Sequence, residues 1–116
     1  MNKAVAVSVE NVVKVYNSSD QPALNGLSLS IEKGEIFGLL GPNGAGKTTT
    51  LSLISGMAQP TSGSIKVFNT DVSLQKKAFL KTLGMVPQEI ALFPSLSGLE
   101  NLNYFASMYG LSANES

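Results

Sequence analysis

One short stretch of this chain sets the architecture around it, and it reads Gly41-Pro42-Asn43-Gly44-Ala45-Gly46-Lys47-Thr48. The stretch matches the pattern G-x-x-x-x-G-K-T at every fixed position. Residues 36–40, before it, form an apolar run without alternation, which is typical of a strand buried on both faces. Residues 48–55, after it, are expected to be helical. A glycine-rich loop between a buried strand and a helix is the setting that this pattern requires.

The residue types in this loop suit the binding of a phosphate chain. Successive N–H groups point at one anion only where the backbone takes angles that glycine reaches without steric cost. The following helix directs its unpaired N–H groups and the positive end of its dipole at the same anion. Lys47 would place its charge between the β- and γ-phosphates, Thr48 would offer a hydroxyl to Mg²⁺, and Thr49 would lie near the α-phosphate. Against the alternative of a plain glycine-rich turn, the full match predicts a nucleoside triphosphate site for Mg-ATP formed by Gly41, Pro42, Asn43, Gly44, Ala45, Gly46, Lys47, Thr48 and Thr49.

The composition limits the class of protein. The chain has 116 residues, 43% of them apolar, which suits one domain with a core. Eight basic residues, all lysine, balance eight acidic ones, so no nucleic-acid partner is expected. Arginine, histidine and cysteine are absent, which excludes a guanidinium clamp on phosphate, histidine acid–base chemistry and disulfides. No run approaches the ~20 apolar residues of a membrane span, so membrane association would come through a partner.

Alternating apolar residues predict strands on both sides of the loop. One or two strands are expected within 5–15, and others at 27–31, 64–68 and 84–86, the last of them short and buried. Asn25-Gly26, Lys33-Gly34 and 60–63 are predicted turns, and 74–83 is predicted to be a helix.

The clearest helix start is Ser97, because Ser97-x-x-Glu100 has the spacing of a capping box. Gly110 is the predicted end of that helix. Apolar residues at steps of three and four predict a buried stripe between these two points: Leu99, Leu102, Phe105, Ala106 and Tyr109.

At this point the sequence resembles the ATP-binding domain of an ABC transporter, and the resemblance covers essentially the whole chain. Gly-Pro-Asn-Gly-Ala-Gly-Lys-Thr-Thr is the usual form of the loop in that family. Further pieces fall in family order, namely Lys33-Gly34-Glu35, Gly63-Ser64-Ile65, Val86-Pro87-Gln88 and Leu96-x-x-Leu99-Glu100-Asn101-Leu102. The resemblance implies an α/β P-loop NTPase fold with an N-terminal antiparallel β subdomain, a parallel core sheet, and a helical subdomain starting at about residue 97. The sequence from Glu100 to Leu111 resembles that of exporter-type members of the family, which move drugs, lipids or ions outward.

The resemblance also assigns roles to two residues outside the loop. Tyr16 stands where the family carries an aromatic residue that stacks on adenine; without the family, packing at a strand end would be the simpler reading. Gln88 stands at the Q-loop, where its amide would contact Mg²⁺ or the attacking water and sense the transmembrane partner; the alternative is a polar strand end. By this resemblance Lys47 and Gln88 are the catalytic residues, and Thr48 and Gln88 the metal ligands.

Three family segments are absent from this sequence. It holds no Leu-Ser-Gly-Gly-Gln signature, no apolar strand ending in Asp-Glu (the Walker B segment), and no switch histidine. Ser112-x-x-Glu115 also repeats a capping spacing just before Ser116. We therefore expect 1–116 to be a partial ATP-binding domain, truncated before these segments. We also expect the piece alone to bind nucleotide weakly and to hydrolyse it negligibly, because it supplies no good candidate for the base.

The leading hypothesis is the ATPase subunit of a membrane transporter. The full-length protein would bind ATP between two such domains, as a homodimer or heterodimer, and would lie in the cytoplasm on the inner face of the membrane through a permease partner. Three alternatives stay open: a non-transport ABC ATPase, another phosphate-loop enzyme such as a kinase or GTPase, and a non-catalytic nucleotide-binding fragment. The kinase or GTPase alternative lacks support, because the sequence contains no arginine to bind a kinase substrate and no Asn-Lys-x-Asp to bind guanine.

Overall fold

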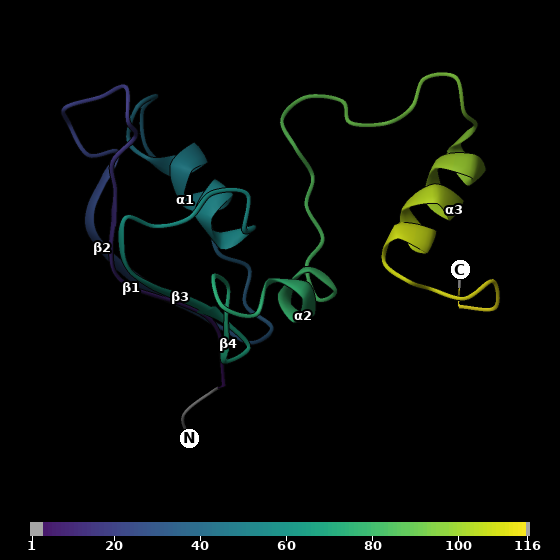
Figure 1. The fold of residues 1–116 in the computed structure, drawn as a ribbon, viewed down its shortest axis with the longest axis horizontal. Helices are drawn as coiled ribbons and strands as arrows, with labels where there is room; N and C mark the ends of the chain where they lie inside the picture. The colour runs from purple at the N-terminus through teal and green to yellow at the C-terminus, as the bar shows by residue number, and fades with distance from the viewer. Residues whose placement is uncertain (1–3, 116) are drawn as a thin grey trace. The chain divides into compact units, whose positions relative to one another are not determined.

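The computed structural model of the chain describes residues 4–115. The chain divides into two compact units, Met1–Leu83 and Gly84–Ser116, and each is described here by itself. The first unit holds most of the regular structure (Figure 1), in the order β1 (Val5–Lys14), β2 (Leu24–Glu32), α1 (Lys47–Ile54), β3 (Ser62–Val67), β4 (Thr70–Asp71) and α2 (Lys76–Leu80). The second unit holds α3 (Gly98–Met108).

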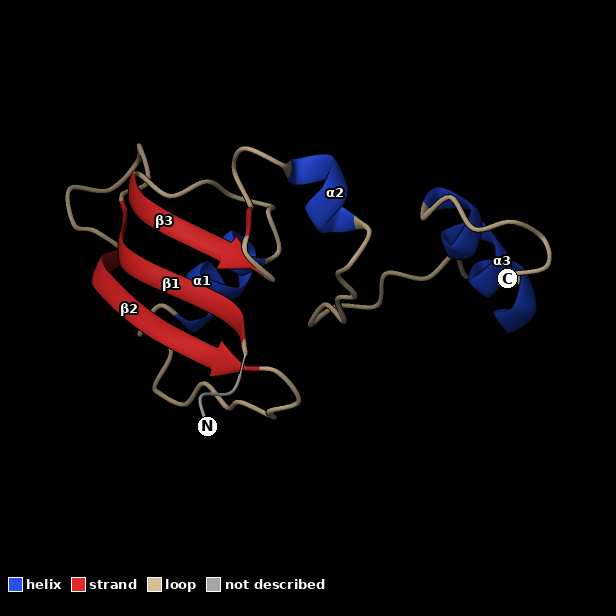
Figure 2. Ribbon diagram, turned by 90° about the horizontal axis from the view of Figure 1, so that it is seen from below, coloured by secondary structure: helices blue, strands red, loops and turns tan. Residues whose placement is uncertain are grey.

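The strands of the first unit form one sheet in the order β2-β1-β3-β4, and every neighbouring pair is antiparallel. The long central strand β1 pairs on both sides, with Val9 opposite Leu29 of β2 and Ile65 of β3. Helix α1 lies across one face of this sheet (Figure 2). The antiparallel β subdomain expected from the sequence is therefore present.

The turn predicted at Asn25-Gly26 is wrong, because both residues lie inside β2. Val12 pairs with Leu27 and Val13 with Asn25, so Gly26 is the extra residue of a β-bulge. The Asn-Gly pair is compatible with either structure, and the long ladder between β1 and β2 selects the bulge.

A close contact joins β1 to β3 at Gly63. This residue has φ +86, and a Cβ added to it would lie 2.4 Å from the carbonyl oxygen of Asn11 and 2.6 Å from that of Glu10. Both neighbours are backbone atoms of β1, which cannot swing aside as a side chain can. Only glycine fits at this position of the sheet.

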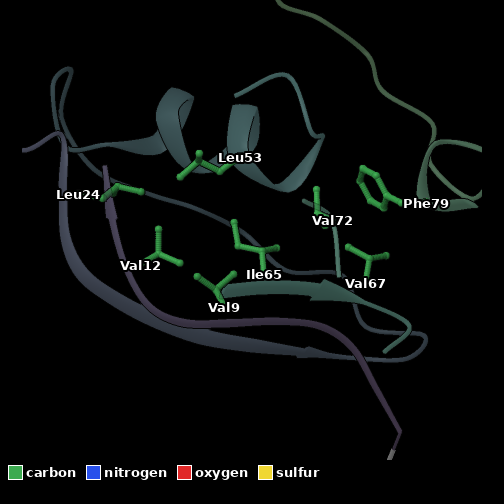
Figure 3. Packing of buried hydrophobic residues seen from close by; sticks show 8 residues of the cluster. All are labelled: Val9, Val12, Leu24, Leu53, Ile65, Val67, Val72 and Phe79. Carbon is green, nitrogen blue, oxygen red and sulfur yellow. The ribbon is translucent and has the colours of Figure 1, made fainter. Parts of the chain in front are cut away.

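The core lies between the sheet and the helices of the first unit. Figure 3 shows Leu53 of α1 facing the side chains that rise from the sheet, and Phe79 of α2 beside Val72 and Val67. The buried cluster consists of Val9, Val12, Leu24, Leu53, Ile65, Val67, Val72 and Phe79. Burying each such side chain stabilises the fold by roughly 1.5–3 kcal/mol before entropy is counted, so these residues hold the unit together.

Two short strands expected for the parallel core sheet carry no strand pairing in the part of the chain that the structure describes. Residues 36–40 and 84–86 have no regular secondary structure. The apolar side chains of these segments are uncovered, with Leu40 96% exposed and Val86 95% exposed. A strand forms only where a neighbour pairs with it, and no described strand pairs with either segment.

Helix α3 begins where the sequence predicts. The Ser97 hydroxyl accepts a hydrogen bond from the Glu100 N–H at 3.1 Å, and the Glu100 carboxylate accepts one from the Ser97 N–H at 2.9 Å. The Ser97 N–H, and after it the Ser97 hydroxyl, lower the pKa of the Glu100 carboxyl. Tyr109 is the C-cap and Gly110 follows with positive φ, so the predicted end is confirmed.

The prediction that the apolar stripe of this helix is core is wrong for the described residues. Leu99 is 68% exposed and Leu102 70% exposed. The buried residue of α3 is Asn101, whose side chain exchanges hydrogen bonds with the backbone of Phe93 and donates to the carbonyls of Leu96 and Ser97. The helix is therefore tied to the segment before it by this amide and by the rings of Tyr104 and Phe105, which contact the ring of Phe93.

None of the helices formed by residues 4–115 is long and apolar enough to cross a membrane.

Candidate nucleotide-binding site

The site is built on the first turn of α1. Its N-cap is Gly46, with φ 95, so no side chain caps the helix. Helix geometry leaves the N–H groups of the first turn without intrahelical partners, and they point out of the helix end. The N-terminus of α1 is thus a set of free donors with the positive end of the helix dipole behind it.

Thr50 fixes this turn from the inside, a role that the sequence analysis missed. Its N–H donates to the Gly46 carbonyl at 2.9 Å, and its hydroxyl donates to the same oxygen at 2.7 Å. The side chain is buried. Threonine is a poor helix former, but here its hydroxyl satisfies the helix's own backbone. A threonine four residues after the last loop glycine is the signal that could have revealed it.

Gly46 also presses the loop against the start of β2. A Cβ at this position would lie 2.7 Å from Cδ2 of Leu24 and 3.1 Å from the carbonyl oxygen of Ala23. A larger residue would therefore meet both the positive φ and a crowded wall. This contact sets the distance between the phosphate loop and the β subdomain.

A hollow of about 360 Å³ lies against the helix N-terminus. It is lined by Ala23, Asn43, Gly44, Gly46, Lys47, Thr48 and Thr49. Six of these seven residues were predicted from the loop motif; Ala23 was not, because nothing in its local sequence marks it. Gly41, Pro42 and Ala45 belong to the same loop and shape it, with the Ala45 N–H donating to the Pro42 carbonyl at 3.2 Å.

Lys47 carries the positive charge of the site. Its ammonium donates hydrogen bonds to the carbonyl oxygens of Gly41 and Pro42, the latter at 3.3 Å. The side chain therefore folds back over the loop and lies half-buried among the donors of the helix end. Free N–H groups and an ammonium around one hollow form a receptor for a polyanion.

Thr48 is the exposed hydroxyl of the hollow. Residues 4–115 contain no group of three or more histidine, cysteine, aspartate or glutamate side chains that could hold a metal ion. A hydroxyl and a few waters suit Mg²⁺ when a phosphate supplies the other oxygens. The donor set fits Mg²⁺ bound together with a nucleotide and does not fit a metal held by protein carboxylates.

Tyr16 follows the end of β1 and is 40% exposed. It is not among the residues that line the hollow. The Nζ of Lys14 lies 5.0 Å from the centroid of its ring.

Gln88 lies in the second unit, in the segment before α3, and is exposed. The residues that line the hollow all belong to the first unit. The metal and catalytic roles expected for Gln88 stay predictions.

A helix N-terminus with a glycine cap, an adjacent lysine and a threonine hydroxyl defines a phosphate-loop nucleotide-binding protein. Similarity to known proteins identifies the family within this class. The family model described as ABC transporter matches residues 24–116. The chain belongs to the ABC transporter family and carries sequence of that family's ATP-binding domain.

Relatives and solved structures agree with this assignment. The chain is 45% identical over 109 residues to the linearmycin resistance ATP-binding protein LnrL of Bacillus subtilis, covering 94% of this chain and 34% of LnrL. It is 42% identical over 107 residues to the Nod factor export ATP-binding protein I of Burkholderia orbicola, covering 92% of this chain and 34% of that protein. The chain thus spans about a third of the length of these relatives.

The fold is also found in a solved ATP-binding cassette. The dimeric post-hydrolysis structure of MJ0796 bound to ADP and Pi matches with a TM-score of 0.78 and 30% identity, covering 94% of this chain and 51% of that one. The ATP-binding subunit of an ABC transporter matches with a TM-score of 0.83 and 28% identity, covering 94% and 45%.

Proposed function

We propose that residues 41–49 bind the triphosphate of Mg-ATP, and that the full-length protein is the ATP-binding component of an ABC exporter. The observation that carries this proposal is the uncapped N-terminus of α1, which opens on the hollow beside the Lys47 ammonium. The free N–H groups and the ammonium are all donors, so the ligand that completes the site is an acceptor-rich anion.

The chemistry of this chain's residues follows from their positions. Lys47 exchanges the carbonyl oxygens of Gly41 and Pro42 for phosphate oxygens, which carry more negative charge and bind an ammonium more strongly. The helix N–H groups hold the phosphates in place, and Thr48 offers its hydroxyl to Mg²⁺. When bound, Mg²⁺ would neutralise phosphate charge and orient the triphosphate.

Two further residues complete the proposed site. Tyr16 supplies a ring on which adenine stacks, and Gln88 supplies an amide for Mg²⁺ or the attacking water. We expect the chain by itself to hydrolyse ATP negligibly, because the sequence contains no good candidate for a base beside the phosphates.

The direction of transport is supported by what the relatives are named for. One is a linearmycin resistance protein and another acts in Nod factor export. The proposed partners are a transmembrane permease and a second ATP-binding domain, and MJ0796 was solved as a dimer. The proposed location is the cytoplasmic face of the membrane, reached through the permease. Nucleic acid is not a proposed partner, since the net charge is zero.

Calorimetry tests the binding step directly. Mg-ATP is titrated into the full chain, its Lys47→Ala variant and its Lys66→Ala variant, which removes an exposed lysine of β3 outside the hollow. Removing Lys47 should weaken binding on the order of 10- to 100-fold, since a charged hydrogen-bond partner is lost. Lys66→Ala should bind as the unaltered chain does. Equal affinities for the Lys47→Ala and unaltered chains would overturn the proposal.

A further inference from the structure

Lys14, the last residue of β1, makes two contacts that fix its ammonium. Nζ donates a hydrogen bond to the Gln59 carbonyl at 2.7 Å, and it lies 5.0 Å from the centroid of the Tyr16 ring. The second distance is within the range of a cation–π interaction. The hydrogen bond to the Gln59 carbonyl restrains the position of the ammonium against the ring.

The backbone on both sides of the ring is held as well. The Val15 N–H donates to the Thr61 hydroxyl at 2.9 Å, and the Ser19 N–H donates to the Tyr16 carbonyl at 3.0 Å. With the main chain fixed, the remaining freedom of Tyr16 is rotation of its side chain. The Lys14 ammonium restrains that rotation.

The same strand end is bonded to the wall of the phosphate hollow. The Ala23 N–H donates to the Lys14 carbonyl at 2.7 Å, and Ala23 lines the hollow. The Lys14 residue thus touches Tyr16 through its side chain and the hollow's wall through its backbone. Tyr16 is 40% exposed, which leaves room for a second planar group.

We propose that Lys14 is a positioning residue for the adenine of the bound nucleotide, acting through the ring of Tyr16. This rests on the proposed function, in which Tyr16 stacks on the base. A cation near one side of a ring draws the π electrons toward itself and lowers the repulsion that a base meets on the other side. Lys14 therefore strengthens base stacking and holds the ring ready for it, without touching the phosphates.

The test compares two probes on the full chain, Mg-ATP and magnesium with inorganic triphosphate. Lys14→Gln removes the charge but keeps a polar side chain with N–H donors, while Lys14→Arg keeps both the charge and the donors. Lys14→Gln should weaken Mg-ATP binding about two- to five-fold and leave triphosphate binding unchanged. Lys14→Arg should bind both as the unaltered chain does, and the matched Lys66→Gln control should too.

A double-mutant cycle shows whether Lys14 acts through Tyr16. In the Tyr16→Leu background, Lys14→Gln should have no further effect on Mg-ATP. The Y16W variant adds a spectroscopic check, because the chain has no other tryptophan. Its indole emission should shift when K14Q is added, before any nucleotide is present.

Each contrary result points to a different failure. If Lys14→Gln weakens ATP and triphosphate equally, or keeps its effect in the Tyr16→Leu background, Lys14 acts on charge or stability and the inference is overturned. It is also overturned if the Y16W emission ignores K14Q, a readout that remains where ATP affinity is too low to compare. If the unaltered chain binds neither probe, the proposed function itself fails.

Discussion

Each of the two units of this chain is stabilised internally by a different kind of interaction. In the first unit, residues far apart in sequence meet, as where Leu53 of α1 packs over Val12 and Ile65 of the sheet (Figure 3). In the second unit, the described stabilising contacts span a few residues each: the capping box of Ser97 and Glu100, and the Asn101 side chain on the preceding backbone. Phe93, Tyr104 and Phe105 add contacts between rings.

This difference shows which structure a short segment can form by itself and which structure needs contacts with residues far away in the sequence. Hydrogen bonds over three to eight residues form in place and leave Leu99 and Leu102 of α3 exposed. A core forms only when strands and helices from across the chain meet, and it then buries those side chains. The same helical spacing of leucines is therefore not sufficient to predict burial.

The largest expected effect lies in the core of the first unit. Leu53→Ala removes a side chain that is 1% exposed and should lower the free energy of unfolding of this unit by about 2–5 kcal/mol. Leu51→Ala is the matched control in the same helix, and it should cost less than about 1 kcal/mol because Leu51 is half exposed. Hydrogen exchange measured across the chain should show lost protection in β1 and β3 and unchanged protection in α3. Equal loss in both units would remove the contrast between them.

A smaller effect is expected from the buried amide of the second unit. Asn101→Ala leaves the Phe93 N–H without its acceptor and should destabilise this unit by about 1–3 kcal/mol. Asn103→Ala, at an exposed position of α3, should be near neutral. The readout is exchange of the α3 amides. Protection that survives Asn101→Ala would show that the aromatic contacts, and not the amide, hold the segment.

The smallest effect concerns pH. The Ser97 N–H and hydroxyl lower the pKa of Glu100, so folding favours the ionised carboxylate. This contribution is complete above the ordinary glutamate pKa of about 4.5 and is lost as pH falls through the lower pKa of the folded state. Fraying of α3, followed by NMR from neutral pH to about pH 3, should therefore increase. Glu100→Gln keeps a side chain that can complete the capping box but cannot ionise, so it should show little pH response. A profile for Glu100→Gln that matches the unaltered chain would contradict this assignment.

The sequence predicts the fold best where the controlling contacts are short. The capping box at Ser97, the end of α3 at Gly110 and the strands β1 to β3 are confirmed. The helix predicted at 74–83 is present as α2 and is shorter. The strands expected at 36–40 and 84–86 are not formed, since pairing is a property of two strands and one strand's sequence does not reveal whether its neighbour is in place.

The candidate site divides in the same way. The phosphate loop is contiguous, so its residues, its glycine cap and its lysine follow from the motif alone. Ala23, the residue before β2, lines the hollow through the tertiary contact with Gly46, and no local sequence pattern predicts that. The sequence does not distinguish Lys14 from any other lysine in a strand. Only the distance between its Nζ and the Tyr16 ring does so.

The backbone contact at Gly63 has a consequence for how this chain can change over generations. The obstacle at that position is the main chain of Asn11 and Glu10, which is the same whatever residues are encoded there. No second substitution in β1 can therefore make room for a side chain at 63. A lineage can abandon glycine there only by an insertion or deletion that reroutes one of the two strands.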